Sequence, residues 1–140
     1  MYALGVGSGV DEPAFVSENT EGVDQLVLPT FALTIGASIG GMPDVGTYDL
    51  ADLVHAEQRL TLESPLPVRG TAEIRQRVVG IYDKGKAAIV ASERTAVDVA
   101  TGRTLFTTYS SSFIAGEGGW GGDSARPDGR DVRRRSQRKG

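Results

Sequence analysis

The chain has 140 residues, of which 39% are apolar and 24% charged, and its formal net charge is −3. This length and mixture fit one soluble globular domain and exclude a disordered, collagenous or two-domain chain. The chain has no cysteine, so a disulfide scaffold, a cysteine nucleophile and a thiolate metal site are excluded as well. No apolar run approaches the roughly 18 residues that a membrane helix needs, and no basic leader opens the chain, so we expect a cytoplasmic protein that contacts no membrane.

The first predicted elements are helical. Residues 2–10 are small and apolar, and they are typical of the last turns of a helix whose beginning is absent. Residues 28–39 predict a buried helix, because Pro29 suits the first helical position and apolar residues recur every four positions from Phe31 and Ile35 onward. We expect this helix to end at its glycine pair. A strand is the alternative for this stretch, since isoleucine and threonine favour sheet.

Residues 49–58 predict a short helical turn. Asp49 is a suitable N-cap, and Leu50 and Val54, with a leucine between them, share one helical face. We expect this turn to lead into a strand over residues 59–63.

Antiparallel strands are predicted from residue 71 onward. Residues 71–78 alternate with period two, as on a half-solvated strand, and Gln76 is the one polar residue on the expected inner face. Glycine-containing turns at 83–86 and 100–102 each join neighbouring strands as a hairpin.

The last predicted strand is Thr104–Ala115. Its large apolar residues Leu105, Tyr109 and Phe113 share one side, which we expect to pack against a helix. An antiparallel meander with one enclosed helix is an α+β arrangement.

We place the end of the folded domain, residues 1–115, before a segment in which five of seven residues are glycine, 116–122. Residues 116–140 are predicted to be a linker and a disordered basic tail, because residues 123–140 carry a net charge of +4 against −7 for the rest. Arginine clusters are typical of nucleic-acid binding. This tail has no aromatic residue for base stacking, however, so we do not expect a nucleic-acid partner.

His55 and Glu57 are the candidate catalytic residues. His55 is the only histidine, and imidazole titrates near neutrality, so with the nearby carboxylate it suggests a general base. The alternative is a hydrogen-bonded structural histidine. One histidine supplies too few ligands for a metal, and we predict no metal site.

A family resemblance covers about residues 2–122. In order along the chain stand YALGVG at 2–7, EN at 18–19, LPTF at 28–31, HAEQ at 55–58, PLP at 65–67, DKGK at 83–86 and LFTT at 105–108. Together these motifs resemble the N-terminal hot-dog domain of the MaoC-like, type 2 (R-specific) enoyl-CoA hydratase/dehydratase family. The resemblance implies a hot-dog fold, in which an antiparallel sheet wraps around a central helix, and it implies an incomplete N-terminus because family members begin earlier.

The resemblance also implies a function. The family adds water to a trans-2-enoyl-CoA to give an (R)-3-hydroxyacyl-CoA, with the CoA thioester as substrate and no other cofactor. In this chain Pro29, Thr30 and Phe31 would form an acyl-binding wall at the helix start, and Lys84 and Lys86 would meet the CoA phosphates.

The family's catalytic aspartate and histidine lie in a second hot-dog repeat, around an Asn-Pro pair that this chain lacks. The resemblance therefore implies a non-catalytic, acyl-CoA-binding half of a truncated hydratase, which needs a second hot-dog domain in a homodimer or heterodimer. Two alternatives stay open. The chain is an inactive remnant or assembly module that keeps the fold, or an autonomous thioesterase or hydratase dimer that uses His55 and Glu57.

Overall fold

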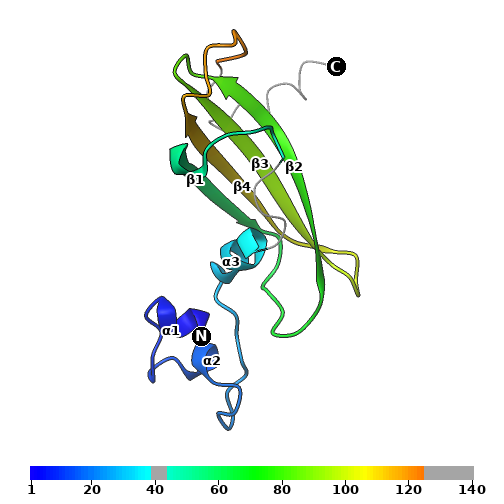
Figure 1. Ribbon diagram of the computed structural model, residues 1–140. Helices are drawn as coiled ribbons and strands as arrows, with labels where there is room; N and C mark the ends of the chain where they lie inside the picture. The colour runs from blue at the N-terminus through cyan, green and yellow to red at the C-terminus, as the bar shows by residue number, and fades with distance from the viewer. Residues whose placement is uncertain (39–43, 125–140) are drawn as a thin grey trace. The chain divides into compact units, whose positions relative to one another are not determined.

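A computed structural model describes residues 1–38 and 44–124 (Figure 1). Its helices are α1 (Tyr2–Gly5), α2 (Pro13–Val16), α3 (Phe31–Ser38) and the short 3-10 helix η1 (Leu50–Asp52). Its strands are β1 (Leu53–Leu62), β2 (Ala72–Asp83), β3 (Ala87–Asp98) and β4 (Thr104–Ala115), which form one sheet in the order β1-β4-β3-β2. Hairpins join β2 to β3 and β3 to β4, and the residue after β1, Glu63, donates its N–H to Leu105 at the start of β4 (2.9 Å). The sheet is therefore antiparallel, and the predicted α+β class is confirmed.

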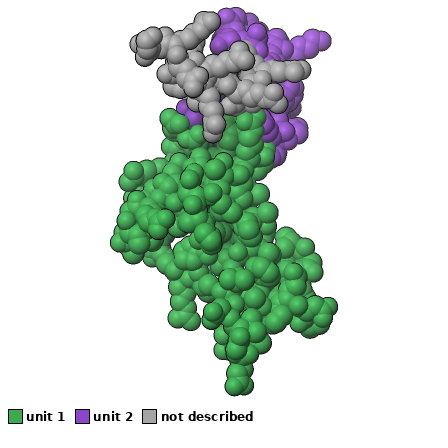
Figure 2. All heavy atoms as spheres, turned by 180° about the vertical axis from the view of Figure 1, so that it is seen from behind, with its two compact units in different colours: residues 1–43, 58–77, 93–109 green, residues 44–57, 78–92, 110–140 purple. Residues whose placement is uncertain are grey.

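The chain divides into two compact units, which Figure 2 colours green and purple. Unit 1 comprises residues 1–43, 58–77 and 93–109, and unit 2 comprises residues 44–57, 78–92 and 110–140. Within the described residues, unit 1 holds α1, α2 and α3 with one half of each strand, whereas unit 2 holds η1 and the β2–β3 turn.

The core of unit 1 lies where α3 contacts the sheet. Ala32 of α3 is fully buried together with Ala96 and Phe106. A Cβ atom on Gly36 would lie only 3.6 Å from the Phe106 ring. The sheet-facing stripe of the helix is thus made of small residues, because close approach to Phe106 leaves no room for larger ones. The predicted stripe is offset from it, since Phe31 and Ile35 are only partly buried beside this core.

The helix itself is confirmed over the alternative strand, but it begins at Phe31, two residues after Pro29, the predicted first helical position. Pro29 and Thr30 form a turn in which their carbonyl oxygens accept from the N–H groups of Ala32 (3.2 Å) and Leu33 (3.1 Å). The predicted glycine end of the helix lies outside the described residues.

The prediction for residues 49–58 is half right. Asp49 caps a helical turn, because its carboxylate accepts from the N–H of Ala51 (2.9 Å). The turn lasts only three residues, and β1 begins at Leu53 rather than at residue 59. Leu50 and Val54 are exposed. They therefore offer no buried helical face, and pairing in the sheet determines the conformation instead.

Alternation along β2 is confirmed from Ala72 to Arg77. The predicted packing side of β4 is only partly right, because Leu105 contacts the core while Phe106 and Thr108 are the residues that lie against Gly36 of α3. Phe113, on the other side of β4, is 37% exposed. Leu105 and Phe106 are consecutive apolar residues on opposite faces of the strand. Apolar side chains therefore occur on both faces, and the sequence pattern did not show which face packs against the helix.

Two further predictions concern chain ends and membranes. The helical end predicted over residues 2–10 is a single turn, α1. Among the described residues, no helix has the length and apolarity needed to cross a membrane.

Candidate functional site

Unit 1 contains an apolar cavity of about 230 Å³ beside α3. Helix α3, the segment from residue 66 to 72 and the start of β4 build its walls. The apolar side chains that line it include Val27, Phe31, Ile35, Leu66, Leu105 and Phe106. Arg69 and Asp98 also line the cavity, so its aliphatic and aromatic walls suit the apolar part of a ligand.

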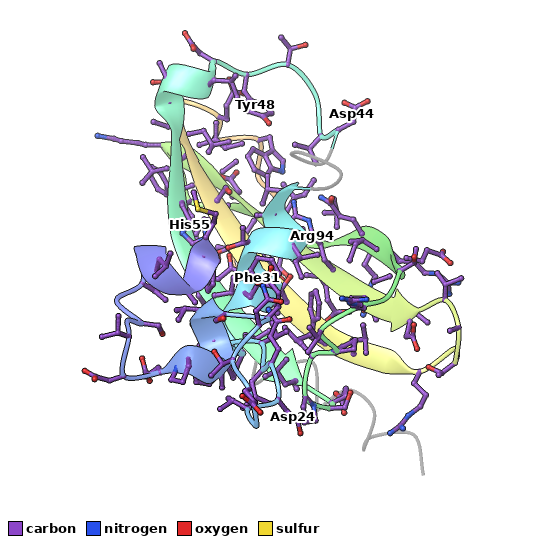
Figure 3. All side chains as sticks on the ribbon, turned by 90° about the horizontal axis from the view of Figure 1, so that it is seen from below. Asp24, Phe31, Asp44, Tyr48, His55 and Arg94 are labelled. Atoms are coloured by element: carbon purple, nitrogen blue, oxygen red, sulfur yellow. The ribbon has the colours of Figure 1, made fainter. Side chains whose placement is uncertain are left out.

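The three residues predicted at the helix start have different environments. Phe31 lines the cavity, and its ring contacts that of Tyr2 with centroids 5.2 Å apart. Pro29 and Thr30 are exposed beside it. Figure 3 labels Phe31, which lies on α3, and Arg94, which lies on β3. The contact between Tyr2 and Phe31 was not predicted from the sequence, because no local pattern links two residues that are so far apart in the chain.

The two predicted phosphate-binding lysines lie in unit 2, on the β2–β3 turn. The Lys84 ammonium donates to the carbonyl oxygen of Ser124 (2.6 Å) and lies 6.0 Å from the centre of the Tyr82 ring. Lys86 is exposed. Lys86 is therefore the more accessible cation of the two.

His55 and Glu57 both lie on β1 rather than on a helix. Their spacing of two places them on the same side of the strand, with His55 exposed and Glu57 half-buried. Within the described ranges, no cluster of three or more histidine and acidic side chains could hold a metal ion.

A buried polar pair on the inner face of the unit 1 sheet was not predicted from the sequence. Arg94 is only 8% exposed, and its Nε donates to Oε1 of Gln76 (3.2 Å). Burial lowers the pKa of Arg94. The amide nitrogen of Gln76 is buried without a hydrogen-bond partner among the described residues. The alternation pattern identified Gln76 as inward, but nothing in the sequence pointed to its partner on β3.

A second missed feature is the segment of residues 116–124, here called the Gly-rich strap, which lies against the β2–β3 turn of unit 2. The Asp83 carboxylate accepts N–H bonds from Gly85 (2.7 Å), Gly119 (2.8 Å) and Gly121 (2.7 Å). Bonds from Gly119 and then Gly85 are the largest causes that lower the pKa of Asp83, and they outweigh the effect of desolvation. A side chain on Gly118 would collide with the backbone of Ala87, so the strap requires glycine there. The domain end at residue 115 stays a prediction.

Comparison with known sequences identifies the family. A family model described as "MFE-2 hydratase 2 N-terminal domain" matches residues 1–116. The chain belongs to this family. The predicted resemblance to MaoC-like, type 2 enoyl-CoA hydratases is thereby confirmed, and the chain is a hydratase-2 hot-dog domain of the enoyl-CoA hydratase and 3-hydroxyacyl-thioester dehydratase type.

Individual relatives support the assignment. The chain is 39% identical over 124 residues to the 3-hydroxyacyl-thioester dehydratase Y of Mycobacterium tuberculosis, a match that covers 87% of this chain and 43% of that protein. The structure of peroxisomal multifunctional enzyme type 2 from Drosophila melanogaster matches with a TM-score of 0.69 and 30% identity, covering 90% of this chain and 22% of that chain. A MaoC-like dehydratase from Phytophthora capsici has the same fold, with a TM-score of 0.72 at 24% identity over 89% of this chain and 45% of that chain.

The chain spans less than half the length of the curated relatives it matches. A relative from Arabidopsis thaliana is named as peroxisomal, so the cytoplasmic location stays a prediction.

Proposed function

We propose that this chain is the acyl-thioester-binding, non-catalytic half of an (R)-specific 2-enoyl-CoA hydratase. In that reaction water adds across the C2–C3 double bond of a trans-2-enoyl-CoA, with hydroxyl bonding to C3 and a proton to C2. An acid–base pair must move these protons. The observation that carries the proposal is the apolar cavity of unit 1 in a chain that matches the model of a hydratase 2 N-terminal domain.

The cavity would bind the acyl chain of the substrate. Phe31 and Ile35 of α3 form one wall, and Leu105 and Phe106 of β4 form another. Each methylene buried there contributes about 0.8 kcal/mol, which is roughly a fourfold gain in affinity. The exposed Pro29 and Thr30 would lie near the mouth, where the thioester leaves the cavity.

The substrate would be the CoA thioester itself, with no further cofactor. Its phosphates need cationic partners, and we assign this role first to the exposed Lys86 and second to Lys84, whose ammonium would have to leave the Ser124 carbonyl.

A partner domain would supply the catalytic aspartate and histidine. The chain has no Asn-Pro pair, which supports the absence of the family's catalytic motif. Strands β1 and β2 are the edges of the four-stranded sheet, and Val54 on β1 is 60% exposed. An open edge strand with exposed apolar residues favours contact with another chain. We propose a second hot-dog domain, in a homodimer or heterodimer, as that partner.

An activity assay tests whether this chain needs a partner domain for catalysis. The purified chain is mixed with crotonyl-CoA, and loss of the conjugated thioester absorbance is followed with and without a separately purified hot-dog domain that carries the Asp/Asn-Pro/His motif. We expect turnover only in the mixture. Turnover by the chain alone that His55→Ala abolishes would refute the proposal in favour of the autonomous enzyme. If neither the chain alone nor the mixture shows turnover, the result would favour the inactive module.

A binding assay tests the cavity. Val68 lines it and is 43% exposed, so Val68→Phe fills the cavity at little cost to folding. Saturated acyl-CoA titrations by calorimetry should show affinity that rises with chain length, and Val68→Phe should remove that dependence. The matched control is Val10→Phe, at a position that is 93% exposed and does not line the cavity. Equal effects of the two variants would exclude this cavity as the acyl site.

A further inference from the structure

Unit 2 contains an apolar cavity of its own, of about 380 Å³. Its aliphatic walls come from Ile81 of β2, Val90 of β3 and Ile114 of β4. This volume falls within the range of small-molecule sites in proteins. None of the residues proposed above for the acyl chain lines it.

The Gly-rich strap forms one side of this cavity. Glu117 and Trp120 of the strap are among the lining residues, together with Tyr48 from the segment before η1. The hydrogen bonds from Gly119 and Gly121 to Asp83 fix the backbone on either side of Trp120. The hydrogen-bonded backbone of Gly119 and Gly121 therefore fixes the position of the indole between them, and the Trp120 residue is 51% exposed.

The lining chemistry selects the charge of a ligand. Two aromatic rings, those of Tyr48 and Trp120, can place their electron-rich faces toward a bound cation, and indole is the strongest such partner. Among the residues that the structure describes, Glu117 is the one carboxylate that lines the cavity, and no described lysine or arginine lines it. A carboxylate or phosphate ligand would thus meet a like charge, whereas an ammonium group would be attracted.

We infer that the cavity of unit 2 is a second ligand site, for small organic cations that have an apolar body. The alkyl part would lie against Ile81, Val90 and Ile114, and the ammonium would lie between Trp120 and Glu117. This assignment does not depend on the hydratase reaction, whose substrate is anionic.

Fluorescence of the full chain tests the inference, because Trp120 is the only tryptophan and therefore the only indole reporter. Hexyltrimethylammonium, hexan-1-ol and hexanoate share one alkyl chain and differ in charge. We expect saturable changes in emission with affinities in the order cation, alcohol, carboxylate, and a difference of about fivefold or more between cation and alcohol. Emission that does not saturate, or equal affinities for all three compounds, would overturn the assignment.

Three variants separate the apolar contribution from the charged one. Glu117→Gln should keep hexan-1-ol binding and reduce the preference for the cation over the carboxylate. Ile81→Thr, at a position 45% exposed, should weaken binding of all three compounds, whereas Val54→Thr on β1 should leave it unchanged. Circular dichroism establishes that each variant is folded. A folded Glu117→Gln protein with an unchanged charge preference, or matching effects of the two threonine variants, would refute the site.

Discussion

Replacing Asp83 by asparagine should loosen the Gly-rich strap without unfolding the sheet. Oδ1 of Asp83 accepts from Gly85 and Gly119, and Oδ2 accepts from Gly121. An amide keeps only one acceptor oxygen, so its NH₂ group would oppose the N–H of Gly121 while the other two bonds lose their ionic strengthening. We expect the ratio of docked to released strap to fall on the order of tenfold to a hundredfold.

The loss should be partial because other bonds stay in place. Gly116 donates its N–H to the carbonyl of Lys86 (2.9 Å), and the N–H of Asp83 donates to the carbonyl of Asp123 (2.9 Å). Acrylamide quenching of the single tryptophan measures the change, since a loosened strap exposes the indole further. Asp83→Asn should raise the quenching constant above that of the unaltered chain.

Asp98→Asn is the matched control. Asp98 caps the β3–β4 turn in the same way, because its carboxylate accepts from the N–H of Ala100 (3.3 Å) and the hydroxyl of Thr101 (2.6 Å). It has no bond to the strap among those described. Similar quenching in both variants would show that turn stability, rather than the Asp83 bonds, controls the strap, and the reasoning would fail.

The pH dependence follows from the lowered pKa of Asp83. A carboxylate whose pKa is lower in the folded state stabilises that state above its ordinary pKa and loses the contribution as pH falls through the lowered value. Quenching should thus stay constant from neutral pH down to the ordinary carboxylate range and rise only below it. The same acid step in Asp83→Asn would assign it to another group.

Three further substitutions test packing. Gly118→Ala should also raise acrylamide quenching, because its Cβ would collide with the backbone at the start of β3; unchanged quenching would show that the strap adapts. Phe106→Ala, at a position 1% exposed, should lower the free energy of unfolding by about 3–5 kcal/mol in urea titrations. Phe113→Ala, at a position 37% exposed, should lower it by only about 1–2 kcal/mol, and a reversed order would contradict the core assignment. Gln76→Glu should raise the free energy of unfolding by about 1 kcal/mol, because it removes a buried NH₂ group without a partner among the described residues and gives Arg94 a charged acceptor. A decrease in the free energy of unfolding would show that burying the carboxylate costs more than the new ion pair contributes.

Features set by neighbouring residues were predictable. The turns at 83–86 and 100–102 form as expected, since Gly85 (φ 78°) and Gly102 (φ 70°) supply the backbone conformation that other residues rarely adopt. The Asp49 cap and the alternation along the first half of β2 are equally local. These features depend only on spacing and on backbone preference.

Features set by distant residues were not predictable. Leu50 and Val54 have helical spacing, yet β1 begins at Leu53 because its backbone pairs with β4, about fifty residues later in the chain. The choice between the two faces of β4 likewise depends on where α3 lies. The clearest case is Asp83, whose bonds to Gly119 and Gly121 join residues 36 and 38 positions apart.

The sequence by itself determined the fold class, the hairpins and, through the order of its motifs, the hydratase family. Only the tertiary structure decided which side chains line the two cavities, that Arg94 donates a hydrogen bond to Gln76, and where the Gly-rich strap lies. The physical reason is range: backbone conformation and hydrophobic period act over a few residues, whereas a cavity or a buried hydrogen bond exists only once strands distant in sequence are paired.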